Sequence, residues 1–223
     1  MRAAARRLAQ GLVLAAVPVG AVALVWPGGL RLPHLWLAIA VGLLGNTLQP
    51  SYQPFEGSRT RHDRGTAAQI LWSVYGAQVA TVVELVLRRP ALSMDAVSWA
   101  ALAAMVLGLA LRTWAVATLG RWFTWNVDVQ AGQRVVERGP YRFVRHPGYL
   151  GALLTYVAVC ALFHCWVAAL LAAVALPVAF VRRIAYEEAL LRRELPGYAA
   201  YARRTPALLA TPRRGSTRRI VGQ

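Results

Sequence analysis

The apolar run LGALLTYVAVCALFHCWVAALLAAVALPVAFV, residues 150–181, decides how the chain folds. One membrane-spanning helix needs about 20 residues, so this run is too long for a single crossing and barely long enough for two. We therefore predict a tight helical hairpin that turns near Phe163-His164-Cys165. Such a hairpin returns the chain to the side of the membrane from which it started.

Four further apolar segments precede the hairpin, at residues 8–26, 34–48, 66–87 and 93–119. Thr66, with Gln69 three residues later, is typical of a capping box at the start of the third segment. Ser93 is the predicted N-cap of the fourth. Hydrophobic residues make up 57% of the chain and its mean hydropathy is +0.44, which is too apolar for a typical soluble domain. The sequence predicts an all-α polytopic membrane protein with about four N-terminal transmembrane helices and a C-terminal transmembrane hairpin.

The first segment has a second interpretation as a signal peptide. Ala21-Val22-Ala23 resembles a cleavage site, and a signal peptide would be removed. The length of the apolar segment favours a retained helix instead. Both readings orient the later helices in the same way.

The charge of the chain is strongly positive. It carries 25 basic residues, all of them Arg, against 9 acidic ones, for a net charge of +16. Arginines concentrate in residues 51–65, in residues 120–148 and after the hairpin, and cytoplasmic segments of membrane proteins are rich in Lys and Arg. We therefore expect the N-terminus and these segments to face the cytoplasm, where anionic lipid headgroups are the partners of the charge.

Other functional classes lack support in the sequence. No nucleic-acid-binding motif accompanies the basic residues, so we expect no nucleic-acid partner. Cys160 and Cys165 match neither a disulfide framework nor a zinc-binding spacing, so we expect no metal. Glu84 and Arg112 are the charges nearest the membrane interior, and both lie within reach of an interface, which favours structural roles.

The stretch GPYRFVRHPGYLG, residues 139–151, leads into the hairpin. Pro147 suits the first position of a helix, and the free N–H groups of a helix start favour an anion such as a carboxylate. Arg145 and His146 would add donors there, while Tyr141 and Tyr149 would offer aromatic faces. Gly148 and Gly151 would allow close approach of a ligand or another helix. This composition indicates a site for a molecule with an anionic group and a planar or cationic part, although an arginine-rich interfacial turn would look similar.

A second group of polar residues follows the hairpin. Arg183 and Glu187 are four residues apart and therefore lie on one face of a helix. Because a hairpin returns the chain to its starting side, Glu187 should come back near His146. We expect Arg145, His146, Arg183 and Glu187 to face one cytoplasmic cavity.

These two groups together resemble a known family. The run LRTWAVATLGRWFTWNVDVQAGQRVVERGPYRFVRHPGYLG, followed by the hairpin and by RRIAYEEALLRRELPGYAAYARRTP, is similar to the isoprenylcysteine carboxyl methyltransferases. The resemblance covers roughly residues 111–211. It implies S-adenosyl-L-methionine as the methyl donor, bound on the cytoplasmic side. It also implies three parts: N-terminal helices on the acceptor side (1–110), a methyltransferase core with the cofactor site (111–211), and a disordered basic tail (212–223).

The resemblance assigns roles to individual residues. Arg183 matches a catalytic arginine on the substrate side, where it would orient an acceptor carboxylate. Glu187 matches an acidic cofactor contact, with Glu188 as the alternative in register. Gln133 stands where the family commonly has a histidine. The residues that match the cofactor-binding positions are Gln130, Val135, Val136, Tyr141, His146, Pro147, Gly148, Tyr149 and Glu187.

The reaction that this resemblance implies is methyl transfer to a lipophilic acceptor, most simply the carboxylate of an isoprenylated cysteine. A lipid amine is the alternative acceptor, and it would need Glu187 or Glu188 as a base. Membrane sterol and steroid reductases, which use NADPH, resemble the same half of the chain. They usually have Asn after the proline and an acidic residue further on, where this chain has Gly148 and Ala152. A non-catalytic membrane scaffold is the third reading.

Overall fold

The structure, a computed structural model, describes residues 2–49 and 65–208. Within these ranges the chain is all-helical without a strand, which confirms the predicted fold class. The predicted disordered tail lies outside the described residues. The helices are α1 (Arg2–Val25), η1 (Pro27–Arg31), α2 (Pro33–Leu48), α3 (Thr66–Arg88), α4 (Ala96–Leu119), η3 (Gly120–Trp122), η4 (Gly139–Arg142), α5 (Pro147–Leu162), α6 (Trp166–Glu194) and α7 (Tyr198–Arg204).

Four helical segments are long and apolar enough to cross a membrane: Arg7–Val25, Thr66–Arg88, Ala96–Trp122 and Trp166–Glu194. Large apolar side chains such as Trp72, Leu87 and Val174 cover their outer surface, as expected for contact with lipid. These features are those of a multi-pass membrane protein. Helices α2 and α5 have 16 residues each. At 1.5 Å per residue they are about 24 Å long, less than the hydrocarbon thickness of about 30 Å. A full crossing by these two helices stays a prediction, as does the orientation of the chain.

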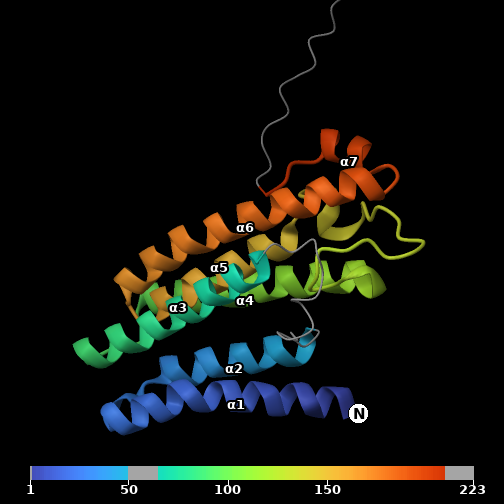
Figure 1. Ribbon diagram of the computed structural model, residues 1–223. Helices are drawn as coiled ribbons and strands as arrows, with labels where there is room; N and C mark the ends of the chain where they lie inside the picture. Colours follow the sequence, from blue (N-terminus) through green and yellow to red (C-terminus); the bar gives the residue numbers. More distant parts are fainter. Residues whose placement is uncertain (1, 50–64, 209–223) are drawn as a thin grey trace, which may run out of the picture.

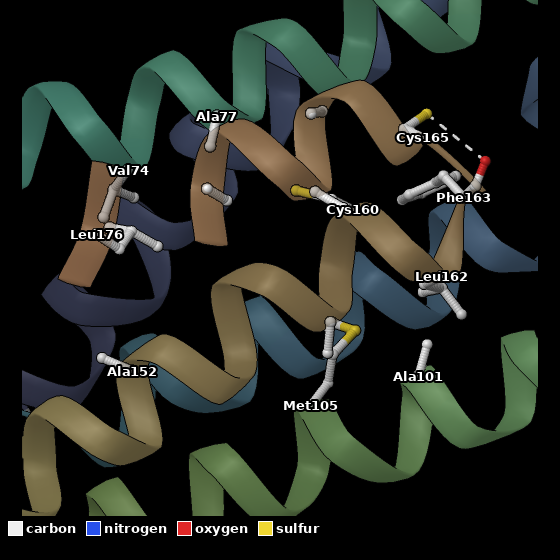
Figure 2. Packing of buried hydrophobic residues seen from close by; sticks show 14 of the residues in the cluster. Val74, Ala77, Ala101, Met105, Ala152, Cys160, Leu162, Phe163, Cys165 and Leu176 are labelled. Atoms are coloured by element: carbon white, nitrogen blue, oxygen red, sulfur yellow. Dashed lines mark hydrogen bonds between the residues drawn. The ribbon is translucent and has the colours of Figure 1, made fainter. Parts of the chain in front are cut away.

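The long helices form two layers. In Figure 1, α3, α4, α5 and α6 lie together as one bundle, and α1 and α2 lie side by side along it. The pairs α4–α5 and α3–α6 make the most extensive contacts between helices. Figure 2 shows the core between them, where Val74 of α3 lies toward Leu176 of α6, and Ala101 of α4 lies near Leu162 of α5.

Helices α4 and α5 approach each other at two glycines. A methyl group at Gly151 would lie 2.5 Å from the carbonyl oxygen of Gly108. A methyl group at Gly108 would lie 2.7 Å from the carbonyl oxygen of Gly151. Real Cβ atoms do not come this close to backbone, so both positions need glycine. The predicted close approach at Gly151 is therefore one of helix to helix.

The predicted hairpin is confirmed. Helix α5 ends at Leu162 and α6 begins at Trp166, so the turn falls on residues 163–165 as expected. The turn closes when the amide of Cys165 donates to the carbonyl of Cys160 at 3.0 Å. Pro147 occupies the first position of α5, also as predicted.

Two predicted helix caps are wrong. The N-cap of α3 is Gly65, in the left-handed region at φ 77°, and it makes no side-chain cap. Thr66 is fully buried and its hydroxyl accepts a hydrogen bond from Arg183 instead. Helix α4 is capped by Asp95, whose Oδ1 accepts from the amide of Ser98 at 2.8 Å. Ser93 lies too far before the helix to reach that amide.

The helical region after the hairpin is interrupted. Helix α6 ends at Glu194, Gly197 adopts φ 85°, and α7 then begins as a separate short helix. Tyr198 and Tyr201 of α7 pack with Leu195 into a small cluster of their own. This break lets the chain fold back over the start of α5.

Candidate functional site

A chain of polar side chains joins three helices where α5 begins and α6 leaves the bundle. The Tyr149 hydroxyl donates to Glu187 Oε2 at 2.9 Å and also hydrogen-bonds the guanidinium of Arg183. Arg183 Nη1 in turn donates to Thr66 Oγ1 at 3.0 Å, and its Nη2 donates to the Trp125 carbonyl. Arg183 is only 4% exposed. The site therefore places a buried cation and a carboxylate on either side of one tyrosine hydroxyl.

Glu188, and not Glu187, contacts Arg145 and His146, the two residues just before α5. Glu188 Oε1 accepts from Arg145 Nη2 at 2.6 Å and lies 3.1 Å from His146 Nε2. Its Oε2 accepts from Arg192 at 3.0 Å. Consecutive residues point about 100° apart around a helix, so the two glutamates reach different partners. The direct partner of His146 is therefore Glu188, while Glu187 contacts Tyr149, three residues further along the chain.

The C-terminal segment lies against the residues just before α5. The backbone amides of Arg145 and His146 donate to the carbonyls of Pro206 and Ala207, at 2.8 and 3.0 Å. The Arg145 guanidinium also donates to the carbonyls of residues 202 and 205, besides Glu188. The Arg145 side chain, expected to bind a ligand, thus holds the C-terminal segment in place, whereas the expected anion site at the helix start stays a prediction.

Tyr141 lies between α4 and α7. It is buried, its hydroxyl donates to the Ala115 carbonyl at 3.4 Å, and its own carbonyl accepts from the Tyr201 hydroxyl at 2.6 Å. Burial raises the pKa of Tyr141 above its ordinary value and raises the pKa of Tyr201 to about 12. Both phenols therefore stay protonated at neutral pH and act as hydrogen-bond donors.

Val135 and Val136 line a cavity of about 670 Å³, which lies between the end of α4 and residues 134–138. Val135 also packs against the α7 tyrosine cluster. The Gln130 side chain donates to the Arg121 carbonyl at 3.0 Å. The backbone N–H of Gln130 donates to Gln133 Oε1 at 2.9 Å. Gln130 and Gln133 thus hold the loop that forms one wall beside the valines.

Arg112, one of the two interior charges expected to have structural roles, joins three helices. Its Nε donates to Gln49 Oε1 at 2.8 Å and its Nη1 donates to the Gly148 carbonyl at 3.1 Å. The guanidinium carbon also lies 5.3 Å from the centre of the Trp125 ring. Arg112 therefore fixes the first turn of α5 against α4 and α2. An arginine inside an apolar segment was the available signal, whereas nothing local pointed to Trp125 or Thr66.

The other interior charge, Glu84, has a structural place. Its Oε2 accepts from the amide of Ala168 in the first turn of α6, and its Oε1 binds Arg88 at 3.1 Å. It lies at the far end of the bundle from Tyr149. Among the described residues, no group of three His, Cys, Asp or Glu side chains is placed to hold a metal ion.

Comparison with known proteins identifies similar sequences. Residues 100–193 match the isoprenylcysteine carboxyl methyltransferase family. Protein-S-isoprenylcysteine O-methyltransferase B of Arabidopsis thaliana is 33% identical over 106 residues, which cover 46% of this chain and 54% of the relative. Nickel-cobalt-cadmium resistance protein NccN of Alcaligenes xylosoxydans xylosoxydans is 30% identical over 155 residues, which cover 69% of this chain and 67% of the relative.

A third relative, the uncharacterized protein YpbQ of Bacillus subtilis (strain 168), is 30% identical over 70 residues, or 31% of this chain and 42% of that protein. The chain therefore spans about half the length of YpbQ and of the Arabidopsis methyltransferase. The family match includes α4, α5 and nearly all of α6, which carry Arg112, Tyr149, Arg183 and both glutamates.

Proposed function

Because the chain belongs to the isoprenylcysteine carboxyl methyltransferase family, we propose that it transfers a methyl group from S-adenosyl-L-methionine to a lipophilic carboxylate. The carboxylate of an isoprenylated cysteine is the acceptor that best fits this proposal. The reaction would take place at the end of the bundle that holds Tyr149, Arg183 and Glu187, on the cytoplasmic side. The first 110 residues would supply the acceptor side, and residues 111–211 the cofactor site.

The side chains there suit the proposed cofactor. Glu187 is half-buried and its carboxylate can accept hydrogen bonds from a ribose beside Tyr149. The Tyr149 ring offers an aromatic face to a sulfonium cation. Val135 and Val136 give an apolar wall to the neighbouring cavity for a planar base. When bound, the cofactor supplies an electrophilic methyl group.

Not every residue assigned to the cofactor has the same role in this proposal. His146 and Pro147 shape the start of α5, and the Gly148 carbonyl is held by Arg112. Tyr141 and Gln130 support the walls of the site through α7 and the loop. These residues would position the direct contacts and act on the cofactor indirectly.

The observation that carries the proposal is the arrangement of Arg183 and Glu187 around the Tyr149 hydroxyl. A buried guanidinium favours an anionic neighbour, and its planar fork matches a carboxylate. An acceptor carboxylate is already ionised at neutral pH, so it needs orientation and no general base. Arg183 would provide that orientation from the acceptor side, and Glu187 would bind the donor. Glu188 is committed to two arginines and is therefore a poor base for an amine acceptor.

The alternatives have weaker support. The match to a methyltransferase family does not favour an NADPH-dependent reductase. The name of NccN refers to metal resistance, but the described residues offer no cluster suited to a metal ion.

Ligand binding tests the proposal. Calorimetry of the detergent-solubilised protein should detect S-adenosyl-L-methionine and no NADPH. Glu187→Gln should weaken cofactor binding by about 1–3 kcal/mol, because a half-buried hydrogen-bonding carboxylate is lost. Glu194→Gln is the matched control, since Glu194 binds only the neighbouring Arg193 at the end of the same helix. NADPH binding without cofactor binding would refute the proposal.

A further inference from the structure

Four polar side chains meet at the end of the bundle opposite Tyr149 and Glu187. His34 is the second residue of α2, Asp95 and Ser98 form the start of α4, and His164 lies in the turn between α5 and α6. They come from three segments that are far apart in the sequence. The proposed methyl transfer gives none of them a role.

The four side chains form a continuous hydrogen-bonded network. Ser98 Oγ lies 3.1 Å from His34 Nε2 and 3.2 Å from His164 Nε2. His164 Nε2 also lies 3.3 Å from Asp95 Oδ1, which caps α4 through the Ser98 amide. His34 and Ser98 are both fully buried, whereas the His164 and Asp95 side chains are 20% and 45% exposed. The network therefore runs from solvent into the core.

One arrangement of protons satisfies the contacts of the network when both histidines are neutral. His164 Nε2–H points to Asp95, and the Ser98 hydroxyl then donates to His34 Nε2. His34 Nδ1 must carry the other proton. It lies near the backbone of Ser93 without forming a hydrogen bond of good geometry. A proton added to His34 Nε2 would bury a positive charge in the core, and the Ser98 hydroxyl would have to rotate from donating to accepting.

The charged groups around the network offset such a charge on His34 only in part. Asp95 contacts His164 and not His34, and its pKa is lowered because the Ser98 amide donates to it. From α3, Arg88 donates to the His164 carbonyl at 2.9 Å and brings further positive charge. The Glu84 carboxylate already forms an ion pair with Arg88 and accepts a hydrogen bond from a backbone amide of α6. Among the described residues, the carboxylate of the network thus contacts His164, and no ion pair involves His34.

We propose that this network is a proton-binding lock, which holds α2, α4 and the α5–α6 turn together while His34 is neutral. Once His34 binds a proton, its positive charge in the core favours opening of the turn. An opened state that exposes His34 binds the proton more readily than the closed state, so acid favours opening. This inference does not depend on the proposed methyl transfer.

Cys165 provides a probe of the turn, because it directly follows His164 and is 1% exposed. In a Cys160→Ala background it is the remaining thiol of the chain. Its reaction with a dipyridyl disulfide, which works in acid, can be measured between pH 5 and 7.5. Dividing by the rate for the same protein denatured at the same pH removes the intrinsic effect of pH on the thiol.

The relative rate should rise by up to about tenfold per pH unit below about 6.5, the ordinary pKa of imidazole. Adding His34→Gln should make it independent of pH, since an amide can still meet Ser98 but does not titrate. Adding His164→Gln instead is the matched control, and the acid response should persist because His34 remains.

Three results would overturn the proposal. The first is a rate that does not change with pH in the Cys160→Ala protein, and the second is an acid response that survives His34→Gln. The third is an acid response that disappears with His164→Gln, which would make His164 the titrating group. If His34→Gln does not give folded protein at pH 7.5, the His164→Gln variant decides: a retained acid response supports the proposal and a lost one refutes it.

Discussion

Replacing Gly151 by Ala tests the contact that sets the start of α5 against α4. The new methyl group would lie 2.5 Å from the Gly108 carbonyl oxygen and 2.8 Å from the Arg112 amide nitrogen. Both are backbone atoms, so the two helices must separate by roughly 1 Å to restore ordinary contact distances. A gap of that size removes about a quarter to a half of the dispersion energy across the interface.

The expected net cost is about 2 kcal/mol. Overpacking a helix interface costs about 1–3 kcal/mol or more, and Ala recovers about 1 kcal/mol through its better helix propensity. One kcal/mol changes the melting temperature of a chain of this size by about 2–4 °C. The melting temperature of Gly151→Ala should therefore fall by about 4–8 °C.

Gly76→Ala is the matched control for this experiment. Gly76 also lies within a helix, but a methyl group there would meet no atom within 4 Å. Only the propensity gain applies, so its melting temperature should rise by about 2–4 °C. Thermal unfolding of both variants in the same detergent measures the two shifts. If they have the same sign and size, α4 and α5 do not touch at Gly151 and the reasoning fails.

Three other perturbations have definite outcomes. Glu188→Gln should cost about 3–5 kcal/mol in thermal unfolding, because Arg145 would be left buried without its carboxylate; a change below 1 kcal/mol would contradict this. Burial raises the pKa of Tyr201 to about 12. The contribution of Tyr201 to the free energy of unfolding should therefore be complete below pH 10 and be lost as the pH rises toward 12. Tyr201→Phe should lose less over that range, and an equal loss would exclude Tyr201 as a contributor. In a chain without native cysteines, Arg193→Cys should react with an impermeant maleimide only from the cytoplasmic side and Pro90→Cys only from the outside, and the reverse pattern would invert the predicted topology.

The length of apolar runs predicted the architecture, because membrane thickness fixes how many residues a crossing needs. The turn at residues 163–165 follows from that argument alone, as does the place of Pro147 at the start of α5. Local capping signals were less informative. Thr66 has the sequence context of a cap, yet its hydroxyl binds Arg183, which is 117 residues away. A tertiary contact of this kind leaves no trace in the neighbouring sequence.

The candidate site was predictable in its members but not in their pairing. The hairpin correctly brought the two glutamates back to the start of α5. Which of them meets His146 depends on the rotation of α6 about its own axis, and one residue changes that angle by about 100°. The return of residues 206 and 207 over the start of α5 was likewise invisible, since it depends on the break at Gly197.

Methyl transfer to a prenylated carboxylate is the most direct test of the proposed function. The purified protein is incubated with methyl-labelled S-adenosyl-L-methionine and an S-prenylated N-acetylcysteine, and the lipid-soluble product is then treated with base. A carboxyl methyl ester releases its label as methanol, whereas a methylated amine or thiol keeps it. We predict base-labile label that is strongly reduced with Glu187→Gln and is kept with Glu194→Gln. Absence of labelled product, or label that resists base, would contradict the proposed reaction.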